Sequence, residues 1–118
     1  MLTRPRWLLQ TEGACYLALG LALYRAGHFP WWLFLALFLA PDLFLLGYLA
    51  NARIGAAFYN LAHTLVWPIA LLLVSLALPA PELAPYGLIW LSHLGFDRML
   101  GFGLKYPTNF RDTHLERV

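Results

Sequence analysis

Charged side chains are scarce in this 118-residue sequence: they make up 12% of it, against about 25% in soluble globular proteins. Hydrophobic residues reach 61%, against roughly 45–50% in soluble chains. Eight Lys and Arg with six Asp and Glu cannot cover the surface of so short a soluble chain, which buries only about two-thirds of its unfolded surface. The composition argues against a soluble monomer or a disordered chain, and it predicts an integral membrane protein.

The sequence also has only one cysteine and no run of basic residues. The single cysteine, Cys15, lies in an apolar stretch and excludes a small secreted domain held together by disulfides. Despite a net charge of +2, the sequence has no run of Lys and Arg, so we expect no nucleic-acid partner. No convincing small-residue cleavage site follows Arg4 and Arg6, so the first apolar stretch is interpreted as a retained anchor.

The apolar residues fall into four stretches long enough to cross a membrane, which takes about 20 helical residues. They cover residues 7–24, 31–49, 54–78 and 86–104, and a polar tail follows at 105–118. Three prolines at 79, 81 and 85 end the third stretch and set the start of the fourth. We therefore expect a single all-α domain, a bundle of four antiparallel transmembrane helices.

The positive charges predict the topology, because Lys and Arg are concentrated on the cytoplasmic side of membrane proteins. With a cytoplasmic N-terminus, that side receives Arg4, Arg6, Arg53, Lys105, Arg111 and Arg117, and the opposite side only Arg25. The sequence thus predicts a multi-pass protein of the cell inner membrane with both termini cytoplasmic and membrane lipids as partners. Small residues along the stretches allow close helix packing, within the chain or in a homo-oligomer.

The predicted spans contain an unusual set of polar residues: Glu12, Asp42, Asn60, His63, His93, Asp97 and Arg98. A charged group near the bilayer centre costs at least about 2.5–3.5 kcal/mol unless it has a partner, a cavity or an ion. Counting residues from the end of each span places five of these side chains at similar depths in the cytoplasmic half of the membrane. They are Glu12, Asp42, His63, His93 and Asp97. His93 and Asp97 also share one helix face, being four residues apart.

These side chains are typical metal ligands. A mixed set of His and carboxylate groups suits Zn²⁺, Mn²⁺ or Fe²⁺ better than Ca²⁺ or Mg²⁺. We expect the ion to be held by Asp42, His63, His93 and Asp97. Glu12 would be the general base or a further ligand, and Asn60 and Arg98 would position substrate. Pro41 lacks a backbone N–H, and a kink there would open space for an ion or water.

Other interpretations of the same residues stay open. Acidic and His side chains inside a membrane also form proton pathways, which would make the chain part of a transporter. His63 and His93 could bind haem from two helices, although haem would not explain the two aspartates. In the plainest case the polar groups only pair helices, for example Asp42 with Arg98 or Arg53, and the chain is a structural bundle or partner subunit.

The segment 94–107, LGFDRMLGFGLKYP, and the following Asp112-Thr113-His114-Leu115 resemble the C-terminal signature of a small bacterial membrane family, domain of unknown function 4260. The segments Leu9-Gln10-Thr11-Glu12-Gly13 and Tyr59-Asn60-x-x-His63 are similar to that family as well. The resemblance covers essentially the whole chain. It implies a bacterial membrane location and no particular activity.

A more distant resemblance has chemical content. Pro41-Asp42, His63-Thr64 and His93-x-x-x-Asp97 are similar to segments of the membrane-bound metal-dependent hydrolases of bacterial inner membranes. Phe44 and Ala62 depart from that pattern, where a second Asp and a Thr would stand, which favours one metal ion over two. The resemblance implies hydrolysis, and the depth of the site suggests a lipid or lipid-linked phosphoester as substrate.

Overall fold

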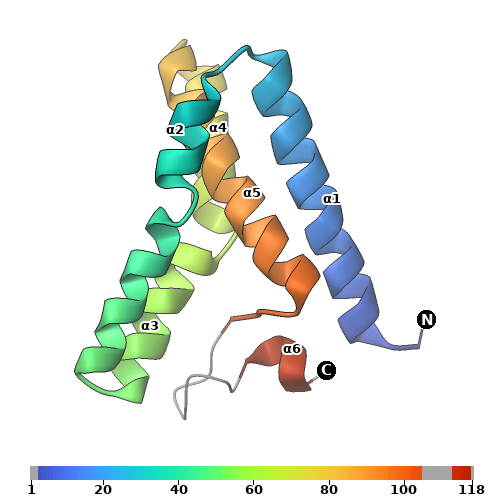
Figure 1. Ribbon diagram of the computed structural model, residues 1–118, viewed down its shortest axis with the longest axis vertical. Helices are drawn as coiled ribbons and strands as arrows, with labels where there is room; N and C mark the ends of the chain where they lie inside the picture. The colour runs from blue at the N-terminus through green and yellow to red at the C-terminus, as the bar shows by residue number, and fades with distance from the viewer. Residues whose placement is uncertain (1–2, 105–112, 118) are drawn as a thin grey trace.

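A computed structural model describes residues 3–104 and 113–117, and within these ranges the protein is all-α (Figure 1). The elements are α1 (Pro5–Ala26), α2 (Trp31–Leu37), the 3₁₀ helix η1 (Ala40–Leu49), α3 (Ala52–His63), α4 (Val66–Ala77), the 3₁₀ helix η2 (Pro81–Leu83), α5 (Ala84–Leu100) and α6 (His114–Arg117). Each of the four apolar stretches is therefore helical, as predicted. Successive stretches run in opposite directions (Figure 1).

The second and third stretches are not continuous helices, in contrast to the simplest form of the prediction. The kink expected at Pro41 is confirmed, since α2 ends at Leu37 and the chain continues as a 3₁₀ helix from Ala40. The third stretch breaks at Thr64, whose backbone is extended at φ −84° and ψ 140°. Pro68 explains this second break, because it has no N–H for the carbonyl of Thr64 and its ring clashes with that carbonyl in a regular helix.

Helices α1 and α5 pack along most of their length, running antiparallel (Figure 1). Glycines make this close approach possible. A Cβ added to Gly95 would lie 2.5 Å from the Leu17 nitrogen and 2.7 Å from the Gly13 oxygen. On the other helix, Gly13 faces the backbone of Arg98 and Met99. The predicted small-residue packing is thus realised between helices of one chain.

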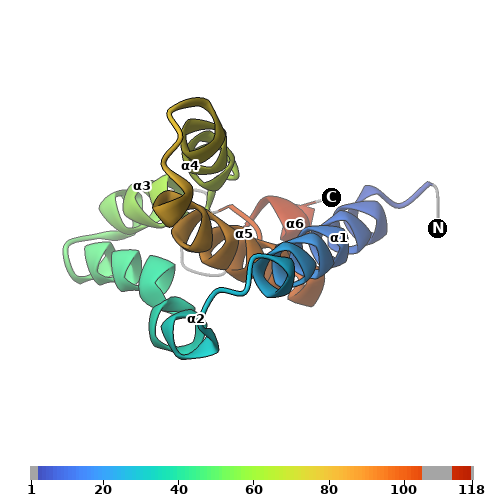
Figure 2. The same cartoon turned by 90° about the horizontal axis from the view of Figure 1, so that it is seen from above.

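The other contacts join α3 to η1 and α4 to α5 (Figure 2). An aromatic core closes the end of the molecule where α1 turns into α2, formed by Tyr24 and Phe34 with Leu88 and Ile89 of α5. The Tyr24 hydroxyl donates a 2.6 Å hydrogen bond to the Pro30 carbonyl. The core therefore fixes the position of α5, the helix that carries two of the expected metal ligands.

One helical stretch in the described ranges, Ala52–Ala77, is long and apolar enough to cross a membrane, and 22% of its most apolar window is buried. Trp31–Leu43 is apolar but shorter. The four-span arrangement remains a prediction. The expected tail at 105–118 lies mostly outside the described residues, and so does Lys105.

Replacing Gly95 with alanine should destabilise the protein by about 1–3 kcal/mol, because the new methyl group meets backbone atoms of α1 that cannot move independently. Thermal unfolding of the purified protein, followed by circular dichroism, measures the loss. Gly27→Ala is the matched control, because a Cβ there would meet only the ring of Phe29, which can rotate away. Equal melting temperatures for the two variants would contradict the described α1–α5 packing.

Candidate metal centre

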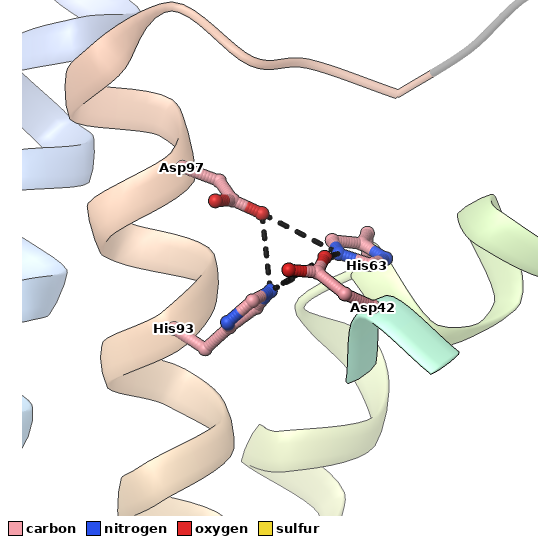
Figure 3. Close-up of side chains that lie close together, drawn as sticks. All are labelled: Asp42, His63, His93 and Asp97. Atoms are coloured by element: carbon pink, nitrogen blue, oxygen red, sulfur yellow. Dashed lines mark hydrogen bonds and ion pairs between the residues drawn. The ribbon is translucent and has the colours of Figure 1, made fainter. Parts of the chain in front are cut away.

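Four side chains from three segments converge on one point (Figure 3). Asp42 lies in the first turn of η1, and His63 is the last residue of α3. His93 and Asp97 project from the same face of α5. One ligand atom from each of these residues lies within 4.8 Å of the other three. The expected ligand set is therefore brought together in space.

Five of the six separations match those of a tetrahedral metal site, and the sixth, between the two carboxylate oxygens, is at most 4.8 Å. His63 Nε2 lies 3.1 Å from Asp42 Oδ1 and 3.4 Å from Asp97 Oδ2. His93 Nε2 lies 3.3 Å and 3.1 Å from the same two oxygens, and the two nitrogens are 3.2 Å apart. Ligand atoms that surround an ion tetrahedrally at about 2.0–2.1 Å are about 3.3 Å from one another. An ion of the size of Zn²⁺ therefore fits between these four atoms.

The hydrogen bonds of His63 prepare it to bind a cation. Its Nδ1 lies 2.8 Å from the Tyr59 carbonyl oxygen, which can only accept, so Nδ1 carries the proton. In the neutral ring Nε2 then has a free lone pair, directed at the centre. The Tyr59 ring stacks on the imidazole at 3.7 Å between centroids and holds its orientation. This is the arrangement in which a backbone carbonyl fixes the tautomer of a metal-ligating histidine.

His93 is enclosed more completely but is less firmly oriented. Its side chain is 1% exposed, and the Phe38 ring contacts it edge-on at 5.3 Å between centroids. Among the described residues, its Nδ1 is buried without a hydrogen-bond partner. Nε2 of His93 is therefore directed at the centre by packing, and its tautomer is not set by a second hydrogen bond.

The two carboxylates are balanced by positive charge at this point, which protons on the two imidazoles or a metal ion can supply. The lone pair of His63 Nε2 faces two carboxylate oxygens, and the histidine side chain is only 3% exposed. Burying two carboxylates and a lone pair without a proton or cation between them would cost several kcal/mol. These groups repel one another, and little water is present to screen the repulsion. A proton on each Nε2 or one divalent cation removes the repulsion, and two nitrogens with two oxygens suit Zn²⁺, Mn²⁺ or Fe²⁺.

Arg98 connects the centre to the C-terminal segment. Its Nη2 donates a 3.2 Å hydrogen bond to the His63 carbonyl, and its Nη1 lies 3.1 Å from Nε2 of His114. His114 Nδ1 accepts a 2.8 Å hydrogen bond from the Leu104 N–H. Burial, together with the charge of Arg98, lowers the pKa of His114 below its ordinary value. His114 is therefore neutral at pH 7.

His114 was not among the site residues proposed from the sequence, although it lies in the segment that resembles the family signature. Nothing in its spacing indicates a contact with Arg98, because residues 105–112 separate it from α5. The only signal was its place beside Thr113 in that signature. The exposed ion pair between Arg6 and Glu116, 3.4 Å long, connects the same C-terminal segment to α1.

The other two expected residues are placed differently. Asn60 is half-buried on α3, one turn before His63. Glu12 is exposed on α1 and is not part of the cluster. Gly95, which faces α1, is two residues from both His93 and Asp97, and two residues turn a helix by about 200°. The ligands thus lie on the face of α5 away from α1, so the structure does not bring Glu12 to the centre.

Comparison with known proteins yields one family and no closer relative. No curated protein and no solved structure matches the chain. The family described as domain of unknown function (DUF4260) matches residues 6–118. Because this match covers nearly the whole sequence, the chain belongs to the DUF4260 family.

Proposed function

We propose that Asp42, His63, His93 and Asp97 hold one divalent transition-metal ion and that the protein is a metal-dependent hydrolase of a lipid or lipid-linked phosphoester. The spacing of the four donor atoms, 3.1–3.4 Å in five of their pairs, is the observation that carries this proposal. It is supported by His63, whose Nδ1 faces the Tyr59 carbonyl and whose Nε2 is thereby directed at the centre, where it can coordinate a cation.

A bound ion would supply Lewis acidity, lowering the pKa of a water molecule and polarising a phosphoryl oxygen. The side chain of Asp42 is 36% exposed and that of Asp97 is 14% exposed, so substrate and water reach the centre past Asp42. The second carboxylate oxygen of Asp42, which does not face the histidines, is thus the group placed to accept the proton of the attacking water. The water oxygen bonds to phosphorus, the phosphorus–oxygen bond to the alcohol breaks, and the alcohol oxygen takes up the proton.

Two further residues assist this reaction in the proposal. Arg98 donates a hydrogen bond to the backbone carbonyl of His63. Its other guanidinium N–H groups can donate to a phosphate oxygen. Asn60, one turn before His63, positions the substrate. These roles agree with the polar residues that the sequence places inside apolar segments.

The proposed location is the cell inner membrane, crossed four times, with both termini in the cytoplasm. Large apolar side chains on the surface support it, among them Leu35, Leu49 and Leu76, which are 79–86% exposed. Such a surface is stable in contact with lipid and costly in water. The contact between Arg6 and Glu116 agrees with termini on the same side. A site among lipid-facing helices favours a substrate that is itself a lipid.

A second candidate is a structural role, in which the cluster only joins helices and the chain is a non-enzymatic subunit. The observation that favours it is that one small cluster connects η1, α3 and α5 through four ligands. Zinc sites with four protein ligands are usually structural, whereas catalytic sites keep a position open for water. In this case the metal would stabilise the fold, and its removal would lower the melting temperature without any loss of catalysis.

Wild-type protein purified without chelators should contain about one divalent metal ion per chain, measured by inductively coupled plasma mass spectrometry. His93→Ala should weaken metal binding at least about 100-fold, since even residues that only support a ligand contribute 10–100-fold. His28→Asn is the control, because His28 lies at φ 55° outside the cluster and asparagine tolerates that conformation. Wild-type protein free of metal after loading with Zn²⁺, Mn²⁺ and Fe²⁺ would refute the metal site.

Reconstituted protein should release phosphate from a long-chain alkyl phosphate, and EDTA should abolish the release until metal is restored. Asp42→Asn should lower the rate at least about 100-fold, as expected when the proton acceptor is lost. Glu82→Gln, which removes an exposed carboxylate at the other end of α5, should leave the rate unchanged. Metal-loaded protein that hydrolyses no phosphoester but melts at a higher temperature than the metal-free form would favour the structural role.

A further inference from the structure

A cavity of about 230 Å³ lies beside the metal centre. Its walls are almost entirely apolar and include Leu37, Ala40, Pro41, Ala62, Ile89 and Trp90. Pro41 directly precedes Asp42, and Ala62 directly precedes His63. On α5, Ile89 lies one turn before His93 on the same face. The cavity is therefore lined by neighbours of three of the four candidate ligands, although none of the four lines it.

The indole N–H of Trp90 is not available to a ligand in the cavity. Trp90 Nε1–H donates a 2.6 Å hydrogen bond to the Ala62 carbonyl, joining α5 to α3. The bond satisfies both polar groups and leaves the ring as an apolar wall. Tyr86, which also lines the cavity and is 45% exposed, carries a hydroxyl group. Since the rest of the wall is apolar, a ligand portion that enters gains mainly by removing hydrocarbon from water, and an alkyl chain is the group that fits.

On the other side of the centre, two hydrogen-bond donors lie together. Since His114 Nδ1 accepts from the Leu104 N–H, the neutral ring carries its proton on Nε2. Nη1 of Arg98, which can only donate, lies 3.1 Å from that atom. Neither group can accept from the other, and an anionic oxygen beside the pair can accept from both. The Arg98 guanidinium also donates a hydrogen bond to the His63 carbonyl, and this bond keeps the guanidinium next to the metal centre.

These features follow one another along α5. Ile89 borders the cavity, His93 and Asp97 hold the centre, and Arg98 comes last. At 1.5 Å per residue, about 12 Å separates Ile89 from Asp97 along the helix. We propose that the protein binds a long-chain alkyl phosphate ester, with its chain in the cavity and its phosphate at the metal centre and the Arg98–His114 pair. The inference rests on the proposed function and specifies the substrate class and its orientation.

Photoaffinity labelling tests the proposal directly. The full chain is loaded with Zn²⁺ in phosphatidylcholine nanodiscs and exposed to dodecyl phosphate that carries a diazirine at the end of its chain. Mass spectrometry should find the label on the cavity residues, and unlabelled dodecyl phosphate should displace it. Dodecanol and inorganic phosphate at the same concentration should not. Labelling confined to the exposed apolar surface, or equal displacement by dodecanol, would overturn the proposal, the latter showing that any bilayer chain occupies the cavity.

Variants test the two ends of the ligand separately. Ala40→Leu fills the cavity with three additional carbon atoms and should weaken dodecyl phosphate binding at least tenfold. Ala36→Leu makes the same change at an exposed position of α2 and should not. Arg98→Gln should remove the preference for dodecyl phosphate over dodecanol, whereas Arg25→Gln, at the exposed end of α1, should keep it. Equal binding by Ala40→Leu and Ala36→Leu would contradict a chain in the cavity.

The labelling needs no turnover, so its failure can be distinguished from failure of the proposed hydrolase. If dodecyl phosphate labels the cavity but is not hydrolysed, the binding mode stands and the hydrolase does not. If short and long alkyl phosphates are hydrolysed at equal rates and the cavity is not labelled, the hydrolase stands and the binding mode is overturned.

Discussion

Two imidazole nitrogens and two carboxylate oxygens meet inside this protein, with five of their six separations at 3.1–3.4 Å, and the two carboxylates must be balanced by protons on the imidazoles or by a metal ion. The constraint determines much of the surrounding structure. It requires the start of η1 and the end of α3 to meet the middle of α5, and it requires Nδ1 of His63 to carry the proton that the Tyr59 carbonyl accepts. A cation at that point satisfies all four groups at once. Without one, the same groups are compensated only when the imidazoles are protonated and pair with the carboxylates.

The sequence was sufficient for the helical segments and for the four side chains that come together in the cluster. Hydropathy and prolines located four helical stretches, and the spacing of His93 and Asp97 placed both on one face of α5. Depth counting, however, measures only the rise along a helix and not the direction in which a side chain points. Glu12 lies at a depth similar to the ligands, but α1 packs against the opposite face of α5 through Gly13 and Gly95. Depth alone could not reveal this.

Contacts between distant segments were also beyond the sequence. The break at Thr64 depends on a proline four residues later, and no charged or polar pattern marks it. The contact of His114 with Arg98 depends on how the chain returns after α5. The break is a local effect of Pro68 and the contact arises from tertiary structure, and both bear on the centre. The break makes His63 a helix end, and the return of the chain places a second donor beside the guanidinium.

The position of His63 at the end of α3 has an electrostatic consequence. The carbonyl groups of the last turn of a helix are not all paired within it, and they give the C-terminus about half a unit of negative charge. α3 runs for twelve residues and ends at His63, one of the four ligand residues. The field of the helix therefore favours a cation at the centre by a few tenths to about 1 kcal/mol. A continuous helix through Thr64 would carry that negative end away to the far end of α4.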